Sequence, residues 1–403
     1  MKVVCDIKDR CGVCPSINTD YDKSLKKKEA FGLGFLKNKG LLESTRVLRT
    51  IPSPRKVGYR TVFKLVVGPA SNQHGKAPSR FRFSLYTPGT HDLGPDLTSC
   101  PLHTAPLRKL LKLLHPVLES SGLQPYDENQ QVGHLKYLIA RSNQEGTELM
   151  MTWVVAKPME RELSEITQRL LEKELPIQVV AMNIHQGTSN AIWGEQTFLL
   201  TQQRSISEKI SDITLELGPT SFFQVNPWQA ENIYRRIRAI GEKQSKRQVA
   251  WDLFSGLGPI SCLLGGVFEN VLSVEENSEA IQLGKLNAEK NGLKQKVSIQ
   301  CGLVEKCLQE VPVRFSEPDV IIANPSRRGI HGEARSVLIN TLRRLQKTEL
   351  VYMSCSLESF TRDLIEFKSH GLELFELQAF DMFAQTDQLE WLGRIRLQKK
   401  RGE

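Results

Sequence analysis

The sequence predicts an α/β protein that combines a doubly wound, parallel sheet with an antiparallel, β-rich region. Between residues 249 and 354, short apolar strands alternate with helix-forming stretches, which is the rhythm of βαβ units. Between residues 58 and 203, apolar and polar residues alternate with a period of two, as in half-buried antiparallel strands. A group of cysteines precedes both regions. We therefore expect a short segment 1–16, a central domain 17–218 and a C-terminal domain 219–403.

Length and charge narrow the class of protein. The chain has 403 residues, which exceeds one ordinary core and indicates two or three domains. Its 54 Lys and Arg residues against 45 Asp and Glu give a net charge of +9, which favours nucleic acid or an acidic membrane surface as partner, although many basic proteins are merely soluble. No apolar run reaches the ~18 residues of a membrane span, and the start lacks a signal peptide's apolar core. We expect a cytoplasmic protein without a membrane partner.

The eight cysteines are not expected to form disulfides in such a protein. Five residues separate Cys5 from Cys11, two separate Cys11 from Cys14, and Cys100 lies far downstream before a proline. Four thiolates suit either a tetrahedral zinc ion or a cubane iron–sulfur cluster, and the spacing does not separate the two. The other four are scattered singly through the last third: Cys262, Cys301, Cys307 and Cys355.

Residues 19–40 are expected to form a helix with a solvated basic face, because several lysines precede an apolar stretch there. The pair Gly32 and Gly34 is not followed by a third glycine at dinucleotide spacing. We expect these glycines at a helix end or turn and not in a phosphate-binding loop.

The central domain is predicted to hold strands at residues 59–66 and 80–86, interrupted by helices at 107–118 and 160–173. Arg and Phe alternate along the second strand. This pattern suits RNA, since guanidinium groups contact phosphates and aromatic rings stack on unpaired bases. The alternative is a surface sheet with a charged outer face.

The C-terminal domain is predicted to begin with a helix opened by Asn226-Pro227, a cap residue followed by proline at the first helical position. The carboxyl ends of parallel strands meet at one edge of a sheet, where reaction sites form. Strands are expected at 249–254, 271–275, 319–323 and 350–354, and helices at 279–291 and 335–347. Four marked residues stand at those strand ends: Phe254, Glu275, Asn324 and Cys355.

A glycine turn, Ser255-Gly256-Leu257-Gly258, follows the first of these strands, and Glu275 ends the next. Glycine allows a cofactor to approach the backbone, and a carboxylate at the second strand end suits both ribose hydroxyls. The three-glycine dinucleotide pattern is absent and no phosphate-binding lysine accompanies the turn. A nucleoside cofactor without a diphosphate, S-adenosylmethionine, fits better. The alternative is a structural turn with a surface glutamate.

Two later strand ends carry further chemistry. Asn324-Pro325 resembles the adenine N-methyltransferase pattern, but Arg327 stands where those enzymes place an aromatic residue. An arginine suits a uracil carbonyl or a phosphate instead. An apolar run delivers Cys355 to the last strand end. An isolated cysteine there indicates an inert core thiol, whereas its three marked neighbours favour a nucleophile.

Together these segments resemble the RNA uracil-C5 methyltransferase family, over nearly the whole chain. The similarity is greatest to the branch that methylates bacterial large-subunit ribosomal RNA and lacks a TRAM domain. It is carried by Ser221-Phe222-Phe223-Gln224-Val225-Asn226-Pro227, the 252–258 turn, the 324–329 segment and Met353-Ser354-Cys355-Ser356.

The resemblance implies a class I S-adenosylmethionine-dependent methyltransferase domain, an RNA-binding central domain and an N-terminal iron–sulfur segment. It implies Cys355 as nucleophile and Glu390 as general base. It also favours a [4Fe–4S] cluster over zinc, with a structural or RNA-holding role because methyl transfer moves no net electrons. The implied cofactor contacts are Gln224, Phe254, Glu275 and Asn324, and the implied cluster ligands are Cys5, Cys11, Cys14 and Cys100.

Uracil chemistry gives these roles a reason. Carbon 5 is too weak a nucleophile to accept a methyl group unaided, and a thiolate added to carbon 6 makes it electron-rich. A base must then remove the carbon 5 proton so that the thiolate leaves. A free thiol has a pKa of about 8.5, so we expect Arg327 or Arg328 to lower the pKa of Cys355.

The sequence departs from the family pattern around the implied base. Gln385 and Gln388 stand where the family has histidines, and Ala384 where it has proline. Because of these replacements, the resemblance does not say how Glu390 is oriented or how its proton is relayed. Two further replacements look tolerable: Ser255 for cysteine and Ser326 for proline.

The expected activity is formation of 5-methyluridine in RNA, with 23S ribosomal RNA as substrate. Transfer RNA is the alternative substrate for the same chemistry. A rival from another class is a metal-cluster RNA-binding protein whose methylase half has decayed. No obligate protein partner is expected.

Overall fold

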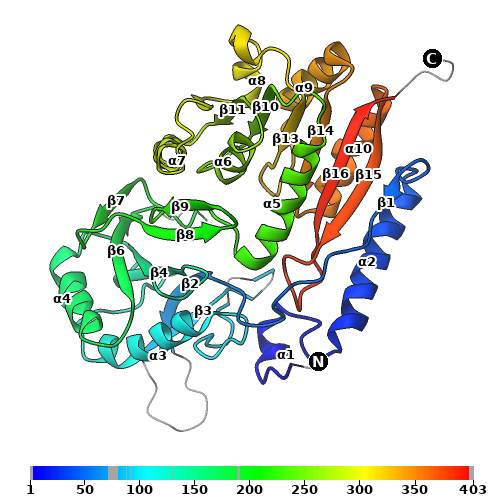
Figure 1. Ribbon diagram of the computed structural model, residues 1–403. Coiled ribbons are helices and arrows are strands. Elements are labelled where there is room, and N and C mark those ends of the chain that lie inside the picture. Colours follow the sequence, from blue (N-terminus) through cyan, green and yellow to red (C-terminus); the bar gives the residue numbers. More distant parts are fainter. Residues whose placement is uncertain are drawn as a thin grey trace.

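The computed structural model describes residues 3–70, 80–87, 89–90, 92–128, 130–187 and 191–398. Figure 1 shows two large bodies, one built on an eight-stranded sheet and one on a six-stranded sheet, with a small two-stranded ribbon between them. Within the described ranges, no helix has both the length and the apolar character needed to cross a membrane.

The eight-stranded sheet has the order β1-β15-β16-β14-β13-β10-β11-β12. Five neighbouring strands, from β14 to β12, are mutually parallel, while β16 runs antiparallel to both of its neighbours. The strands are β1 (Arg46–Val47), β10 (Val249–Leu253), β11 (Asn270–Glu275), β12 (Val297–Cys301), β13 (Val320–Ala323), β14 (Glu349–Ser354), β15 (Leu372–Phe380) and β16 (Glu390–Leu397). The predicted doubly wound sheet is confirmed.

Helices cover both faces of this sheet, which is why its central strands are apolar almost throughout. One face packs against α5 (Pro227–Glu242), α6 (Pro259–Gly265) and α7 (Ser278–Lys290). The other packs against α2 (Tyr21–Asn38), α8 (Val304–Cys307), the 3₁₀ turn η1 (Val313–Phe315), α9 (Gly332–Leu345) and α10 (Leu357–Ser369). Along β10 the residues alternate accordingly, with Ala250 facing the first group and Trp251 the second.

The start of α5 is as predicted. The Asn226 side chain accepts a hydrogen bond from the Gln229 amide at 3.2 Å, and Pro227 occupies the first turn. Asn226 also donates through Nδ2 to the carbonyl of Met382 at 3.1 Å. The cap therefore ties this helix to the segment between β15 and β16.

The six-stranded sheet has the order β3-β2-β4-β5-β6-β7. Its pairs are antiparallel except β5–β6, which is parallel because α4 carries the chain back along the sheet. The expectation of a wholly antiparallel sheet was wrong at this pair. The elements of this body are α1 (Lys8–Cys11), β2 (Val62–Pro69), β3 (Phe81–Ser84), α3 (Ala105–Glu119), β4 (Leu135–Ser142), β5 (Leu149–Val155), α4 (Glu160–Leu171), β6 (Ile177–Ile184) and β7 (Gln196–Leu199).

The ribbon between the bodies consists of β8 (Ile206–Ile210) and β9 (Ile213–Leu217). Its apolar side chains share one core with α5 and α6, together with Met150 and Val179 of the six-stranded sheet. The amide of Glu216 donates to the Asn287 side chain of α7 at 2.7 Å. The two bodies are thus joined through buried side chains.

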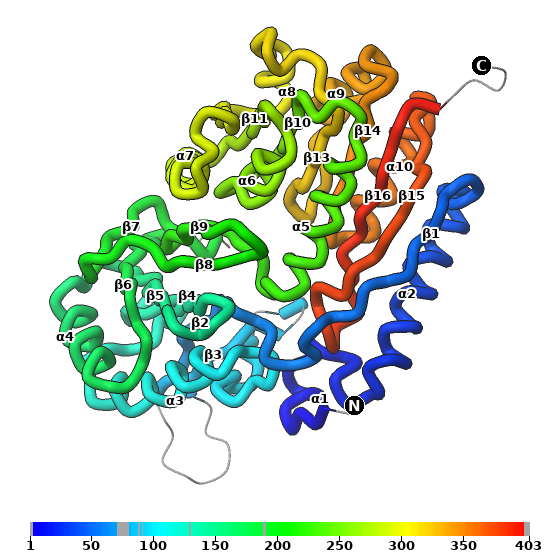
Figure 2. Tube along the Cα trace, in the orientation of Figure 1, coloured from blue at the N-terminus to red at the C-terminus, as the bar shows by residue number. Residues whose placement is uncertain are grey.

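The N-terminal region packs on the eight-stranded sheet, although residues 17–218 were expected to form the central domain. β1 pairs in parallel with β15, and α2 contributes Leu36 to the core beneath that sheet. Figures 1 and 2 show α2 in blue running alongside the red β15–β16 hairpin.

Gly32 and Gly34 lie inside α2, so the prediction of a helix end or turn was wrong. A Cβ atom at Gly32 would collide with the ring of Trp391 on β16. The missing side chain allows that tryptophan to lie directly against the helix. The glycine is there for packing between two elements, which a local pattern does not reveal.

Candidate active site

The strand register gathers the predicted site residues at one edge of the eight-stranded sheet. Leu253 of β10 is aligned with Val274 of β11 and with Ala323 of β13, and Ala323 is aligned with Tyr352 of β14. Each of these aligned residues on β10, β11 and β13 is followed in the chain by a predicted site residue: Phe254, Glu275 and Asn324. Cys355 is the first residue after β14 and lies three residues beyond Tyr352. The prediction that these strand ends meet at one edge is confirmed.

The turn after β10 has an unusual backbone. Phe254 has a φ of 60°, and Gly256 and Gly258 have φ values of 56° and 80°. The left-handed region costs a non-glycine residue about 1–3 kcal/mol, and such strain clusters where ligands bind. The turn directs the chain from β10 into α6, and it is held by its own backbone: the Ser255 amide donates to the Val274 carbonyl at 3.1 Å, and the Gly258 amide donates to the Ser255 carbonyl at 3.0 Å.

Glu275, the last residue of β11, is hydrogen-bonded to this turn. One carboxylate oxygen accepts a hydrogen bond from the Gly256 amide at 2.9 Å, and the other accepts one from the Asn277 amide at 2.9 Å. The carboxylate therefore bridges the turn after β10 and the start of α7. This is the place predicted for a group that binds ribose hydroxyls.

Asp252 lies beneath the turn and was not singled out from the sequence as a site residue. It is fully buried, and Oδ2 accepts from the Ser261 hydroxyl at 2.5 Å, while Oδ1 has no hydrogen-bond partner among the described residues. Burial raises the pKa of Asp252 to about 7. The signal that could have identified it is a carboxylate in an otherwise apolar strand.

The segment preceding α5 crosses between the two bodies. The buried Arg141 of β4 donates through Nη2 to the Ser221 carbonyl at 2.9 Å, and the Thr61 amide donates to the Val225 carbonyl at 3.0 Å. Gln224 is thereby held between the six-stranded sheet and the eight-stranded one. Phe222 beside it is 68% exposed. Arg141 was missed because its partner lies 80 residues away.

Cys355 and Glu390 face each other at the open end of β14 and β16. The last antiparallel pair between these strands is Ser354 with Trp391, so the next residues along the ladder are Cys355 and Glu390. Glu390 also pairs with Phe380 of β15 and is 3% exposed. Thiol and carboxyl groups that were predicted as nucleophile and base thus lie together.

The pKa of Cys355 shifts opposite to expectation. Burial, followed by the negative charge of Glu390, raises the pKa of the thiol to about 11, while Arg327 lowers it and is outweighed. The prediction of a depressed pKa was therefore wrong in its net direction, although Arg327 acts as expected. Burial also raises the pKa of Glu390 to about 8. At pH 7 the carboxyl is largely protonated, which reduces its repulsion of a thiolate.

The segment after β13 is anchored to α10. The Ser359 hydroxyl donates to the Arg327 carbonyl at 3.1 Å, and Arg362 donates to the Arg328 carbonyl at 2.8 Å. These contacts hold the segment that begins with Asn324 beside the strand end carrying Cys355. A cationic side chain is thus kept near the thiol.

The four predicted cluster cysteines gather in one place. The thiols of Cys100, Cys11 and Cys5 are near enough to raise the pKa of Cys14, which burial and these neighbours together bring to about 12. In the part of the chain that the structure describes, however, no three or more His, Cys, Asp or Glu side chains are arranged to hold a metal ion. The four thiols are thus close together and suit a thiolate-bound cluster by their chemistry, but they are not arranged around a metal position, so the iron–sulfur site stays a prediction.

Comparisons with known proteins agree on the enzyme class. A family model described as RNA cap guanine-N2 methyltransferase matches residues 247–367, from the start of β10 into α10. An uncharacterised RNA methyltransferase of Chlorobaculum tepidum is 27% identical over 398 residues, covering 96% of this chain and 81% of that protein. The 23S rRNA (uracil(747)-C(5))-methyltransferase RlmC of Glaesserella parasuis is 30% identical over 391 residues, covering 95% of each.

A solved structure extends the comparison to the fold. The tRNA (uracil-54, C5)-methyltransferase of Pyrococcus abyssi, in complex with S-adenosyl-L-homocysteine, superposes with a TM-score of 0.73. It is 22% identical, and the match covers 95% of this chain and 85% of that one. At this identity the likeness concerns the fold, which confirms the α/β methyltransferase architecture.

Proposed function

This chain belongs to the RNA uracil-C5 methyltransferase family, and we propose that it transfers the methyl group of S-adenosyl-L-methionine to carbon 5 of a uracil in 23S ribosomal RNA. The observation that carries this proposal is the facing pair of Cys355 and Glu390 at the strand edge that also holds Glu275 and the strained turn. A thiol opposite a buried carboxyl suits covalent activation of a pyrimidine followed by proton removal.

The residues fit a nucleoside cofactor. The carboxylate of Glu275 is oriented by two backbone amides, and Asp252 offers a buried Oδ1 that no described residue engages. Gln224, Phe254 and Asn324 complete the proposed binding set around them. When bound, S-adenosyl-L-methionine supplies an electrophilic methyl group on a sulfonium.

The chain's own residues do the remaining work. The Cys355 thiol gives up its proton to solvent, the thiolate bonds to carbon 6 of the uracil, and the electron pair displaced from the double bond makes carbon 5 nucleophilic. After carbon 5 has accepted the methyl group, Glu390 takes the proton from that carbon. The electrons restore the double bond and expel the thiolate. A carboxyl with a pKa of about 8 is a stronger base than an ordinary one.

We propose that Cys5, Cys11, Cys14 and Cys100 hold a [4Fe–4S] cluster with a structural role. Support comes from the proximity of the four thiols and from their donor chemistry. Protein purified without oxygen should contain about four irons per chain and absorb visible light. Stoichiometric zinc without iron would replace this assignment with a zinc site.

The basic charge of +9 and the exposed Phe222 beside Gln224 support RNA as the macromolecular substrate. The central domain is the proposed RNA-binding surface. Transfer RNA is a second candidate, favoured by the likeness to the Pyrococcus abyssi enzyme. A ribosomal RNA substrate would be met in the cytoplasm, as the sequence leads us to expect.

Methyl transfer to RNA tests this function directly. Protein is incubated with labelled S-adenosyl-L-methionine and either 23S ribosomal RNA or transfer RNA that lacks the modification, and nucleosides are separated. Label in 5-methyluridine from ribosomal RNA is expected. Label only from transfer RNA would change the substrate, and no label from either, with cofactor bound, would favour a non-catalytic RNA-binding protein.

A further inference from the structure

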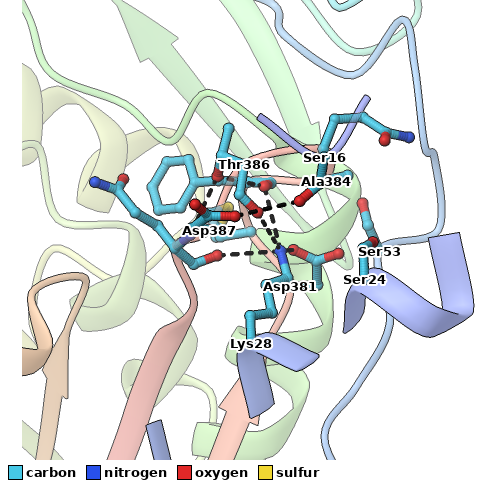
Figure 3. Close-up of polar contacts among 12 residues, drawn as sticks. Ser16, Ser24, Lys28, Ser53, Asp381, Ala384, Thr386 and Asp387 are labelled. Carbon is cyan, nitrogen blue, oxygen red and sulfur yellow. Dashed lines mark hydrogen bonds and ion pairs between the residues drawn. The ribbon is translucent and has the colours of Figure 1, made fainter. Parts of the chain in front are cut away.

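We propose that Lys28 of α2 is a positioning residue for the general base, because it fixes the 381–389 loop that leads directly into Glu390. This inference rests on the proposed function. The loop joins β15 to β16, and Glu390 is the first residue of β16. Figure 3 shows the Lys28 side chain reaching from its helix into this loop.

Lys28 is buried and surrounded by oxygen atoms of the loop. Its ammonium lies 2.5 Å from Oδ1 of Asp381, and the two side chains are 5% and 0% exposed. It also donates to the carbonyls of Thr386 and Gln388, both at 3.2 Å. The Phe383 carbonyl lies 3.4 Å from the same nitrogen, so four oxygen atoms of the loop share the three protons of the ammonium.

The ion pair closes the loop on itself. Asp381 is its first residue and Gln388 its last but one, so a single ammonium holds both ends together. Leaving such a charge unpaired in a buried site is costly, so the pair is expected to constrain the backbone tightly. Only Leu389, itself buried, separates the Gln388 carbonyl from Glu390.

Other N-terminal groups hold the same loop. The Tyr21 hydroxyl donates to Oδ2 of Asp381 at 2.6 Å, and the Tyr59 hydroxyl donates to the Ala384 carbonyl at 2.9 Å. The Ser16 amide donates to the Gln385 carbonyl at 3.2 Å. The Ser16 hydroxyl also donates to the Asp387 side chain at 3.2 Å, and among these anchors Lys28 reaches furthest along the loop toward Glu390, at the Gln388 carbonyl.

This arrangement explains how the base is oriented where the family's histidines are replaced. The side-chain amide of Gln385 donates to the Lys56 carbonyl at 3.2 Å. The amide of Gln388 donates to the Thr386 hydroxyl at 3.3 Å. The loop is therefore ordered by hydrogen bonds to its backbone carbonyls, and the ammonium of Lys28 binds those closest in sequence to Glu390.

The test compares Lys28→Gln with Lys27→Gln, an exposed lysine next to it on α2. RNA containing 5-fluorouridine stops the reaction after methyl transfer, since fluorine is not removed as a proton, so adduct formation reports the early steps alone. Lys28→Gln should form this adduct within about threefold of the wild-type rate, yet turn over normal RNA at least about tenfold more slowly and retain covalent protein–RNA on it. Lys27→Gln should match wild type in both.

A purely structural role gives a different result. If Lys28→Gln slows adduct formation and turnover equally, with no covalent species on normal RNA, the positioning role is wrong. Should the single variant fold poorly, the pair Lys28→Gln with Asp381→Asn removes both buried charges and must still show the delayed release. Absence of any fluorouridine adduct with wild type would instead overturn the proposed function itself.

Discussion

Cys355 and Glu390 occupy facing positions one step beyond the Ser354–Trp391 pair, where β14 meets β16, and the charge of Glu390 raises the pKa of the Cys355 thiol. The carboxylate therefore opposes ionisation of the thiol that it faces. The consequences of this arrangement can be measured.

Replacement of Glu390 should separate the two halves of the reaction. In Glu390→Gln the thiol still adds to the uracil and carbon 5 still accepts the methyl group, but the proton is not removed. Turnover should fall by about 10²–10⁴. Denaturing gels should show covalent protein–RNA on normal RNA. Glu373→Gln, on the neighbouring strand β15, should retain turnover; a Glu390→Gln enzyme that turns over normally would exclude this residue as the base.

The rate at which the methylated covalent adduct breaks down on normal RNA should rise with pH and level off above about 8. Burial raises the pKa of Glu390 to about 8, and only its ionised form removes a proton. The measurement forms the adduct at one pH, transfers it rapidly to buffers between pH 6 and 9, and follows the loss of covalent protein–RNA, so that the earlier addition of the Cys355 thiolate does not contribute. A rate that falls over this range would contradict the role of Glu390 as base.

The stability of the fold should respond to the same carboxyl. An unfolded glutamate ionises near pH 4.3, whereas folded Glu390 keeps its proton to about 8, so folding becomes less favourable as the pH rises between these values. Glu390→Gln removes this penalty. Its urea midpoint should equal that of wild type at pH 4 and exceed it by pH 8. Equal midpoints at both pH values would show that Glu390 is not held protonated.

The contact between α2 and Trp391 predicts opposite effects for two glycines of one helix. A Cβ at Gly32 collides with the Trp391 ring, whereas at Gly34 it meets no described atom within 4 Å. Gly32→Ala should destabilise the protein by about 1–3 kcal/mol through overpacking. Gly34→Ala should stabilise it by up to about 1 kcal/mol, because alanine favours the helix. Urea denaturation measures the free energy of unfolding of both variants. Similar changes at the two sites would contradict the close contact between Gly32 and Trp391.

Loss of the Glu275 carboxylate should weaken cofactor binding. Glu275→Ala should raise the Kd for S-adenosyl-L-methionine by about 10- to 100-fold, since hydrogen bonds to a charged group are lost. Glu276→Ala changes the exposed neighbour and should leave the Kd unaltered. Isothermal titration calorimetry measures both. Equal affinities would remove Glu275 from the binding site.

The sequence anticipated the features that depend on local pattern. Alternating strands and helices located the strand ends, and parallel strands necessarily bring such ends together, so the shared edge of Phe254, Glu275, Asn324 and Cys355 was predictable. The cap at Asn226 was equally local. The placement of Glu390 beside Cys355 came from the resemblance, since β16 reaches this edge from the opposite direction.

Features that depend on distant contacts escaped prediction. Lys28 belongs to a lysine-rich stretch that resembles a solvated helix face, and its partner Asp381 lies 353 residues away. Gly32 is explained only by Trp391. The pKa of Cys355 depends on burial and on the facing carboxyl, neither of which follows from nearby arginines.

Locating the covalent bond between protein and RNA is the most direct test of the proposed mechanism. Wild-type protein, S-adenosyl-L-methionine and 5-fluorouridine RNA are mixed, the complex is digested, and mass spectrometry locates the nucleotide on the chain. The predicted product is a methylated fluorouridine joined to the peptide that contains Cys355, and Cys355→Ala should yield none. A nucleotide joined to another residue, or an unchanged yield from Cys355→Ala, would contradict the role assigned to this thiol.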